Sequence, residues 1–195
     1  MAEFVHLHNH TEYSLLDGLS KIKPMIEYIK ELGMKSIAIT DHGNMYGTVR
    51  FYKTCLEEGI KPIIGCEIYV AKRSLRDKEA EDKDYNHLIL LAENETGYKN
   101  LMKIVTVANL EGFYYKPRTD LELLEKYHEG LICLSACVNG YVSEPIMKGN
   151  DEMAEERAIK LSKIFGVNNF YFELQKHLNV PPQENVNKKL LKLSK

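Results

Sequence analysis

Short apolar runs alternate with amphipathic stretches along most of the chain. The apolar runs predict strands at residues 4–8, 36–40, 62–70, 87–92, 131–136 and 170–174. The stretches between them carry apolar residues at helical spacing and predict helices over 24–33, 46–58, 97–109, 151–165 and 183–194. Such alternation is typical of parallel strands joined by crossover helices, so we expect an α/β fold. Both a doubly wound sheet and a (β/α) barrel fit the pattern.

Two segments depart from this alternation. Residues 72–86 carry five basic and five acidic residues and almost no apolar ones, which predicts a solvated insertion between two strands. The last stretch, "ENVNKKLLKLSK", is a helical pattern without a capping glycine, a proline or a following strand. A (β/α) unit is expected to continue there, so we expect the chain to be truncated at its C-terminus.

Length and composition indicate an ordinary soluble domain. The 195 residues suit one domain with a sizeable core, and 44% are hydrophobic while 28% are charged. The net charge of −2 excludes binding of nucleic acid by bulk electrostatics, so any such contact must be local. No apolar run approaches the length of a membrane span, and we expect no membrane partner. The four cysteines are sparse and irregularly spaced, which favours a reducing, cytoplasmic location.

The first candidate chemistry lies in "HLHNHTEYSLLDG", residues 6–18. In a strand, side chains two residues apart share a face, with Cα atoms about 6.5 Å apart. His6, His8 and His10 therefore can point the same way, and two of them could hold one metal ion or adjacent ions. The alternative is a strand with exposed histidines, because short motifs recur by accident.

Further polar residues fall at the ends of other predicted strands. "AITDHGNMYG" ends a strand with His42, "CLSACVNG" places Cys137 just past a strand, and "FELQKH" ends at His177. Glu67 stands inside the apolar run "IIGCEIYV", where an unpaired carboxylate would be costly to bury. Alternation puts Cys66 on the opposite face, so we expect Cys66 in the core and Glu67 in a site. Reacting groups of α/β proteins gather at the carboxyl ends of parallel strands.

Two further residues fit this rule less well. Asp17 lies in "LLDG", which is also ordinary turn chemistry, so by itself it is interpreted as structural. His87 begins its predicted strand, at the wrong end for a parallel barrel. It can join the others only if that strand runs antiparallel or if the preceding loop enters the site.

The donor set of imidazoles, carboxylates and one thiolate suits zinc, manganese or iron better than calcium or magnesium. It exceeds what one tetrahedral ion needs, so two or three ions that share bridging carboxylates are the natural inference. Clustered ions lower the pKa of a bound water and neutralise phosphate oxygens, so phosphoester hydrolysis is the leading chemistry.

These motifs, together with "HLILLAENETGYKNLMKI" and "GFYYKPRTD", resemble the PHP (polymerase and histidinol phosphatase) domains at the N-terminus of bacterial DNA polymerase III alpha subunits. The likeness runs from about residue 4 to about 178. It implies a PHP domain over residues 1–195 with a distorted (β/α)7 TIM-like barrel and a trinuclear metal centre at the C-terminal ends of the strands. The last metal motif of the family, Asp-x-His on a later strand, has no counterpart in the chain.

The resemblance also assigns residues. It leaves His6 outside the ligand set and implies catalysis through metal-bound water by Asp17, His42 and Glu67. His177 matches a position near the family's site and is a candidate for substrate binding. The implied metal ligands are His8, His10, Asp17, His42, Glu67, His87 and Cys137.

The segment "GFYYKPRTD" combines Phe113, Tyr114 and Tyr115 with Lys116 and Arg118. Aromatic residues beside cations can stack on a base and hold a phosphate, which makes Lys116 and Arg118 candidates for substrate binding. The alternative is a proline-containing loop that packs its aromatic residues on the surface.

Three functions are compatible with these features. The first is a metal-dependent phosphoesterase acting as a 3′–5′ exonuclease on the primer strand of DNA, beside the remaining domains of a polymerase. The second is a structural module that stabilises the polymerase or docks a proofreading subunit. The third is a free-standing phosphatase of the histidinol-phosphate type. DNA synthesis itself is not encoded here, because nothing after residue 137 supplies the acidic residues of a palm domain.

Overall fold

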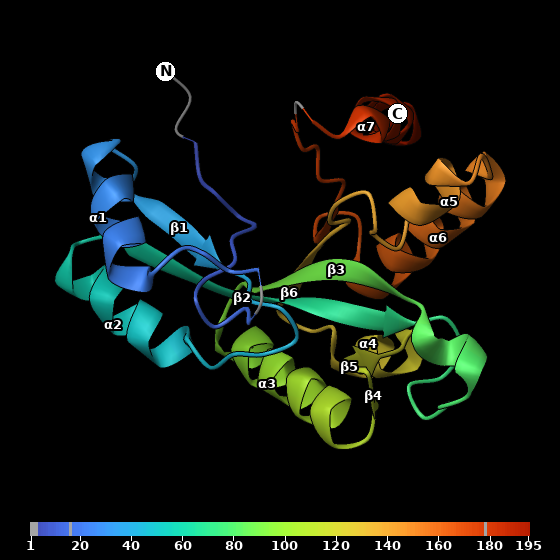
Figure 1. The fold of residues 1–195 in the computed structure, drawn as a ribbon, viewed down its shortest axis with the longest axis horizontal. Helices are drawn as coiled ribbons and strands as arrows, with labels where there is room; N and C mark the ends of the chain where they lie inside the picture. The colour runs from blue at the N-terminus through green and yellow to red at the C-terminus, as the bar shows by residue number, and fades with distance from the viewer. Residues whose placement is uncertain (1–3, 16, 178) are drawn as a thin grey trace.

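The computed structural model describes residues 4–15, 17–177 and 179–195, and it shows a curved sheet flanked by helices (Figure 1). The strands are β1 (Ser36–Ile39), β2 (Lys61–Ala71), β3 (Tyr85–Ala92), β4 (Phe113–Tyr114), β5 (Lys116–Thr119), β6 (Leu131–Leu134) and β7 (Phe170–Tyr171). The helices are α1 (Ile22–Glu31), α2 (Thr48–Glu57), α3 (Glu95–Leu110), α4 (Leu121–Tyr127), α5 (Ser143–Met147), α6 (Asp151–Phe165) and α7 (Pro181–Leu193), with a 3₁₀ turn η1 (Ala80–Lys83). The α/β class is therefore confirmed.

Strand β3 is reversed relative to its neighbours in the sheet. The strand order is β4-β5-β2-β3-β6-β7, and β1 pairs with the first part of β2. The pairs β1/β2, β2/β5 and β6/β7 are parallel, whereas β3 is antiparallel to both β2 and β6. The first residues of β3 therefore lie at the same edge of the sheet as the last residues of β2 and β6.

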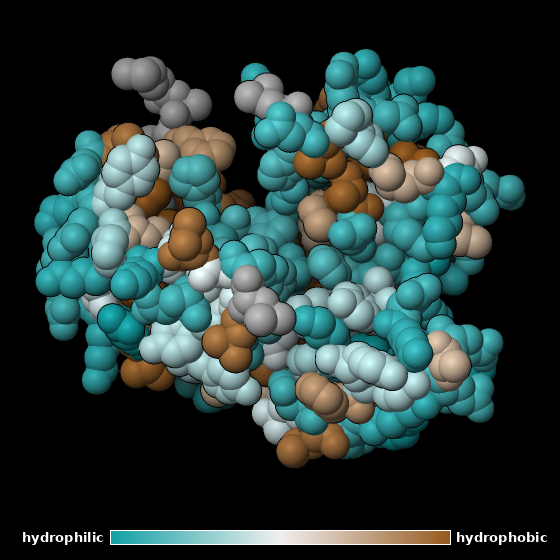
Figure 2. All heavy atoms as spheres, viewed as in Figure 1, coloured by the Kyte–Doolittle hydropathy of each residue, from teal (hydrophilic) through white to brown (hydrophobic). Residues whose placement is uncertain are grey.

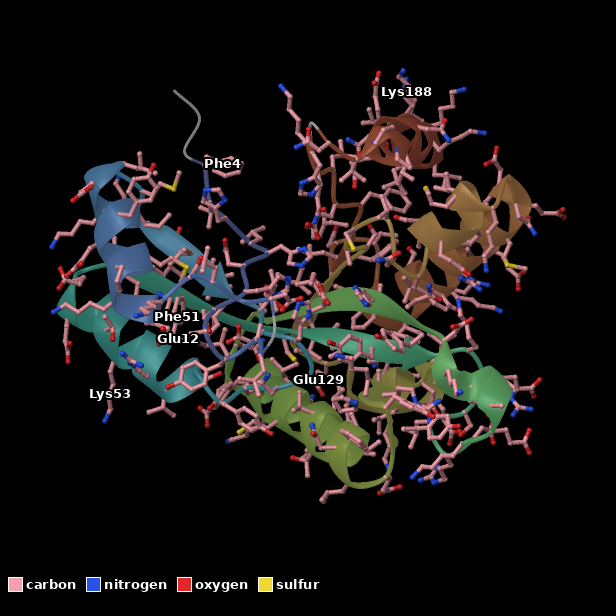
Figure 3. The ribbon with its side chains drawn as sticks, viewed as in Figure 1. Phe4, Glu12, Phe51, Lys53, Glu129 and Lys188 are labelled. Atoms are coloured by element: carbon pink, nitrogen blue, oxygen red, sulfur yellow. The ribbon has the colours of Figure 1, made fainter. Side chains whose placement is uncertain are left out.

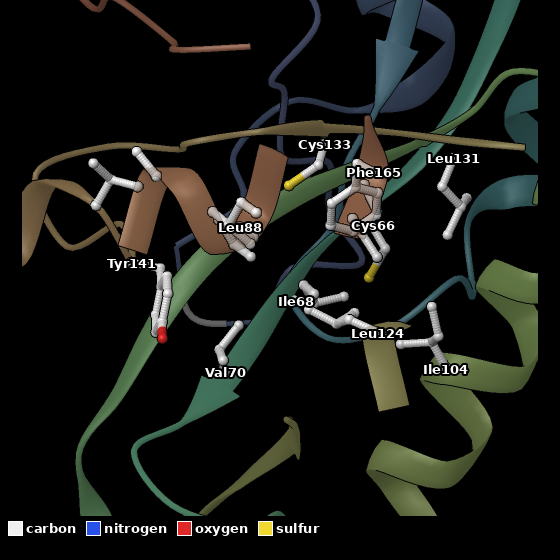
Figure 4. Close-up of a cluster of buried hydrophobic side chains, with 14 of the residues drawn as sticks. Cys66, Ile68, Val70, Leu88, Ile104, Leu124, Leu131, Cys133, Tyr141 and Phe165 are labelled. Carbon is white, nitrogen blue, oxygen red and sulfur yellow. The ribbon is translucent and has the colours of Figure 1, made fainter. Parts of the chain in front are cut away.

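The main core lies on the outer face of the sheet. Cys66, Ile68 and Val70 of β2 point to this face together with Leu88 and Leu90 of β3, and all five are buried. They pack against side chains of α3, α4 and α6 (Figure 4). Because strand residues alternate between faces, Glu67, Tyr69 and His87 point inward instead.

A second cluster fixes the N-terminal part of the molecule. Ile22 and Ile26 of α1 pack with Ile37 of β1 and with Phe51 of α2, which is completely buried (Figure 3). This packing holds α1 and α2 beside β1, whose end leads into His42.

The structure differs from the sequence prediction at the first predicted strand. Residues 4–8 are not a regular strand but an extended segment beside β1, where Ala38 and Thr40 donate to the carbonyls of His6 and Asn9. The donors are two residues apart and the acceptors three, so the pairing contains an extra residue, as in a bulge. The Asn9 side-chain amide donates to the carbonyls of His6 and Ala38 at 3.1 Å and so links the two segments where their backbone pairing is interrupted.

The inner face of the sheet opens onto a hollow of about 820 Å³ between residues 4–8 and 171–177. Figure 2 shows this side as a depression between two lobes. Within the described residues, no strand pairing closes the sheet between β7 and the first segment. No described helix is long and apolar enough to span a bilayer.

Candidate metal centre

The side chain of Glu67 lies at the centre of a group of imidazoles. The residue is 1% exposed. Its Oε2 lies 2.9 Å from His8 Nε2 and 3.6 Å from His10 Nε2. Its Oε1 lies 2.7 Å from His42 Nδ1 and 3.2 Å from His87 Nδ1. The two carboxylate oxygens therefore face two different pairs of histidines.

The charges in this group are strongly coupled. Burial would raise the pKa of Glu67, but hydrogen bonds from His42 and His8 and the charge of His87 hold it well below its usual range. Burial likewise opposes protonation of His8, but hydrogen bonds to Glu173 and Glu67 raise its pKa to about 9. Burial lowers the pKa of His10 and of His87, with the neighbouring imidazoles acting in the same direction.

The first segment carries His8 and His10 into the group because it runs along β1. Their rings meet edge to face, with centroids 4.9 Å apart, and the two Nε2 atoms are 3.1 Å apart. His6 is not part of the group, since its ring packs edge-on against Phe4.

A buried carboxylate folds the loop that follows. Asp41 accepts hydrogen bonds from the backbone N–H and hydroxyl of Thr11 and from the hydroxyl of Ser14. Gly18 closes the loop, because a Cβ there would lie 1.9 Å from the Thr11 carbonyl oxygen. The loop folded in this way positions Asp17. Asp41 therefore has a structural role.

Asp17 and His42 form the solvent-facing edge of the group. Asp17 Oδ2 lies 3.1 Å from His42 Nε2, and its side chain is 64% exposed. The His42 ring stacks on His10 with centroids 3.9 Å apart. Burial opposes protonation of His42, but Glu67 and Asp17 together raise its pKa. The structure thus brings Asp17 to the group, although its sequence context alone indicated an ordinary turn.

His87 and Cys137 complete the group from the other side. Because β3 runs antiparallel, His87 at its start reaches the edge where the other strands end. The loop after β6 pairs with the backbone of this residue: the His87 backbone N–H donates to the Asn139 carbonyl, and the His87 carbonyl accepts from the Tyr141 backbone N–H. Ala136 has φ of 60°, which turns the chain so that Cys137 Sγ lies 3.9 Å from His87 Nδ1. Burial raises the pKa of this thiol.

The donor atoms fit divalent ions. Ligands at about 2.0–2.1 Å around a tetrahedral ion lie about 3.4 Å from one another. The three distances between His8 Nε2, His10 Nε2 and Glu67 Oε2 are 3.1, 2.9 and 3.6 Å. His10 Nδ1 is buried without a hydrogen-bond partner among the described residues. The other oxygen of Glu67 lies beside His42 Nδ1 and His87 Nδ1. Asp17 meets the opposite nitrogen of the His42 ring, and Cys137 approaches His87.

The sequence reasoning missed Glu173, which lies two residues after β7. Its Oε1 lies 2.8 Å from His8 Nδ1, so the Nδ1–H of His8 can donate to it and leave the Nε2 lone pair directed at the group. Gln175 contacts both residues, and His177 lies one step further out, where its Nε2 meets Gln175 Oε1 at 2.8 Å. A carboxylate at a strand end, the signal already used elsewhere, would have identified Glu173.

The two basic candidates for substrate binding lie in different environments. Arg118 is 0% exposed, and its guanidinium donates to the backbone carbonyls of Gly112, Asp82, Leu75 and Asp77. The expectation that Arg118 binds substrate is therefore wrong: it holds residues 75–82 in place and gives part of the predicted solvated insertion a fixed conformation. Lys116 instead lines a cleft of about 400 Å³ with Asp17, His42 and His87.

Comparisons with known proteins agree with this geometry. The PHP domain family matches residues 6–177. The chain is 50% identical over 196 residues to the DNA polymerase III subunit alpha of Borreliella burgdorferi. It is 51% identical over 176 residues to that of Treponema pallidum. These alignments cover 100% and 89% of the chain but 17% and 15% of the relatives, so the chain spans about a sixth of their length.

One solved structure has the same fold. A protein of Bifidobacterium adolescentis, named as a metal-dependent phosphoesterase, superposes with a TM-score of 0.58 at 14% identity. The superposition covers 100% of this chain and 84% of that protein. At this level of identity the likeness concerns the fold alone.

Proposed function

The chain belongs to the PHP domain family, and from this premise we propose that its histidine and carboxylate group binds two or three divalent ions and hydrolyses phosphoesters. Zinc and manganese are the leading ions, with iron as a further candidate, because the donors mix nitrogen, oxygen and sulfur. The observation that carries the proposal is the position of Glu67, whose two oxygens face two separate pairs of histidines.

The proposed ligands are His8, His10, Asp17, His42, Glu67, His87 and Cys137. Bound ions would supply an activated water and neutralise charge on phosphate oxygens. Glu67 links the two pairs of imidazoles. Glu173 fixes the ring of His8 through its Nδ1, the nitrogen that does not face Glu67. Asp17, bonded to His42 and exposed to the cleft, would help to hold the ion that activates the water. Lys116 attracts the phosphate, and His177 has only an indirect link to the group through Gln175.

The proposed substrate is the 3′ end of a DNA strand, and the proposed activity is that of a 3′–5′ exonuclease. The relatives named DNA polymerase III subunit alpha support this choice, because they place similar domains in proteins that act on DNA. In this proposal the chain is one PHP domain of a longer cytoplasmic protein. Its partners are the remaining polymerase domains, the primer strand and a proofreading subunit.

Nucleotide release tests the function directly. The chain is loaded with Mn²⁺ or Zn²⁺, its metal content is measured, and it is incubated with 3′-labelled and 5′-labelled single-stranded DNA. We expect labelled mononucleotide from the first substrate and a ladder of shortened strands from the second. No release from a metal-loaded chain would contradict the proposal and favour a structural role for the metal.

The first segment supplies a matched pair of variants. His8→Ala removes a proposed ligand, whereas His6→Ala removes a ring that packs on Phe4 instead. We expect release to be lost in His8→Ala and kept in His6→Ala. Equal rates in both variants would show that the release comes from a contaminating nuclease.

A further inference from the structure

The cleft beside the metal centre has aromatic walls. Its lining joins Asp17, His42 and His87 to six aromatic side chains, Tyr13, Tyr46, Tyr69, Tyr85, Phe113 and Tyr115. Its volume of about 400 Å³ lies in the range of small-molecule sites, which are about 300–1,000 Å³. Such a cleft can accept one nucleotide and is too small for a base pair within a duplex.

Tyr115 stands at the rim of this cleft in a costly conformation. It forms the turn between β4 and β5, where Tyr114 pairs with Lys116, and its φ is 59°. Glycine adopts this conformation without steric penalty, whereas a bulky side chain rarely does so. The ring is nevertheless 63% exposed, so burial of apolar area does not account for a tyrosine here. Strain at an exposed aromatic residue beside a reactive group indicates a role in binding.

The neighbours of Tyr115 hold its ring in place. The ring of Tyr114 meets it edge to face, with centroids 4.7 Å apart, and Lys83 Nζ lies 5.4 Å from its centre. Tyr114 in turn lies against the guanidinium of Arg118, at 5.2 Å, and Arg118 is anchored in the interior. Tyr115, at the rim of the cleft, is thus connected through Tyr114 to the buried Arg118, and its position does not depend on a ligand.

A cation lies between the rim and the metal centre. Lys116, the residue after Tyr115, places its Nζ 5.5 Å from the centre of the Tyr69 ring, and Tyr69 stands directly opposite His87 in the sheet. An anion in the cleft therefore meets the positive charge of Lys116, which lines the same cleft as the exposed aromatic residues and His87. Aromatic faces followed by a cation form the pattern that holds single-stranded nucleic acid.

We propose that this cleft binds the unpaired terminal nucleotide of a DNA strand, with its base stacked on Tyr115 and its phosphate beside Lys116. Phe113, which is also exposed at the rim, provides a second apolar surface for the base. This inference rests on the proposed function, because it takes the same strand end as the ligand. It adds that the site selects an unpaired end through its base, since a base paired within a duplex must first give up its pairing and stacking to reach Tyr115.

Binding in excess EDTA separates recognition from hydrolysis. Anisotropy of 5′-fluorescein oligonucleotides is measured with the full chain for three 3′ ends: an unpaired nucleotide, an abasic nucleotide, and a blunt duplex. We expect the unpaired end to bind at least about fivefold more tightly than the other two, as base stacking on aromatic residues allows. Tyr115→Gly should abolish this difference, Tyr115→Phe should retain it, and Lys116→Gln should weaken binding to all three ends.

Tyr115→Gly relieves the backbone strain, so its melting temperature should be no lower than that of the wild type. Tyr28→Ala, which removes an exposed ring of α1 that does not line the cleft, is the matched control and should bind like the wild type. Absence of binding, equal affinity for the three ends, or an unchanged preference in Tyr115→Gly would each overturn the inference.

The two proposals fail in different ways. Base-dependent binding without nucleotide release from metal-loaded protein would remove the exonuclease function and keep the terminal-nucleotide site. Normal release by Tyr115→Gly with unchanged KM, together with equal affinity of the wild type for the three ends, would keep the exonuclease and remove this site.

Discussion

At the scale of residues, Glu67 has a carboxylate that is almost completely buried and yet stays ionised. Burial of an isolated carboxylate would cost several kcal/mol. Here two imidazoles donate to it and two more lie within 3.6 Å, so its pKa falls despite the burial. The negative charge of Glu67 stabilises either the protonated form of the neighbouring imidazoles or metal ions bound between them. The same geometry therefore accounts for the raised pKa of His8 and for the proposed metal affinity.

Replacement of Glu67 tests its bridging position. Glu67→Gln keeps the shape of the side chain but removes the charge and one ligand oxygen. We expect the bound metal to fall by at least half and nucleotide release to fall at least about 100-fold, because a metal loses both affinity and orientation. Elemental analysis and the release assay measure the two effects. Glu58→Gln, which alters a surface pair with Lys30, is the control; full metal content in Glu67→Gln would rule out a bridging role.

The pKa of His8 makes metal binding dependent on pH. With a pKa of about 9 in the metal-free protein, His8 is protonated at neutral pH and must lose that proton before its Nε2 can act as a ligand. The apparent affinity for Mn²⁺ should therefore rise at least about tenfold for each pH unit between pH 6 and pH 8, since the buried Cys137 thiol must also lose a proton. Calorimetry in buffers of different ionisation enthalpy measures the released protons directly. An affinity independent of pH, with no released proton, would show that His8 is not a ligand.

Single residues also show how much of the site could be predicted from the sequence. Alternation within one strand correctly separated Cys66 in the core from Glu67 in the group. The pattern of aromatic residues beside cations gave Arg118 the wrong role, because local sequence does not reveal that remote carbonyls surround its side chain. Glu173 was not predicted, because His177 was the residue assigned to this strand end, although it lies two hydrogen bonds from His8, through Gln175.

At the scale of elements, the direction of β3 decides whether the group is complete. The apolar pattern predicted this strand but not its direction, because the two directions have the same alternation. The group needs the antiparallel direction, since His87 then lies opposite Tyr69 and beside Glu67. The short hairpin β4–β5 and helices α4 and α5 were likewise not predicted, as they are too short for a periodic signal.

The hairpin β4–β5 provides a prediction that separates stability from binding. Arg118→Met should lower the free energy of unfolding by about 3 kcal/mol or more, because several buried carbonyls lose their donor. Lys116→Met, on the same strand, should change stability by less than about 0.5 kcal/mol and weaken oligonucleotide binding. Urea unfolding and anisotropy measure the two quantities. A stable Arg118→Met variant with impaired binding would restore Arg118 as a substrate contact.

At the scale of the whole molecule, the group joins the first segment to the segment after β7, between which the described residues form no strand pairing. Its members come from the first segment, the loop after β1, strands β2 and β3, and the loop after β6, and the bond from His8 to Glu173 reaches the segment after β7. His8 and Glu173 also line the hollow that the inner face of the sheet leaves open. Without ions, hydrogen bonds of His8 and His42 to Glu67 and of His8 to Glu173 link these parts.

Metal should therefore stabilise the fold as well as supply chemistry. At a free metal concentration 100-fold above Kd, one bound ion adds about 2.7 kcal/mol to the free energy of unfolding. For a chain of this size, that gain corresponds to an increase in Tm of about 5–10 °C. We expect EDTA to remove the increase in the wild type and in His6→Ala, and we expect His8→Ala to show little of it. Differential scanning calorimetry with and without Mn²⁺ measures the shift, and an equal shift in His8→Ala would place the stabilising ion elsewhere in the molecule.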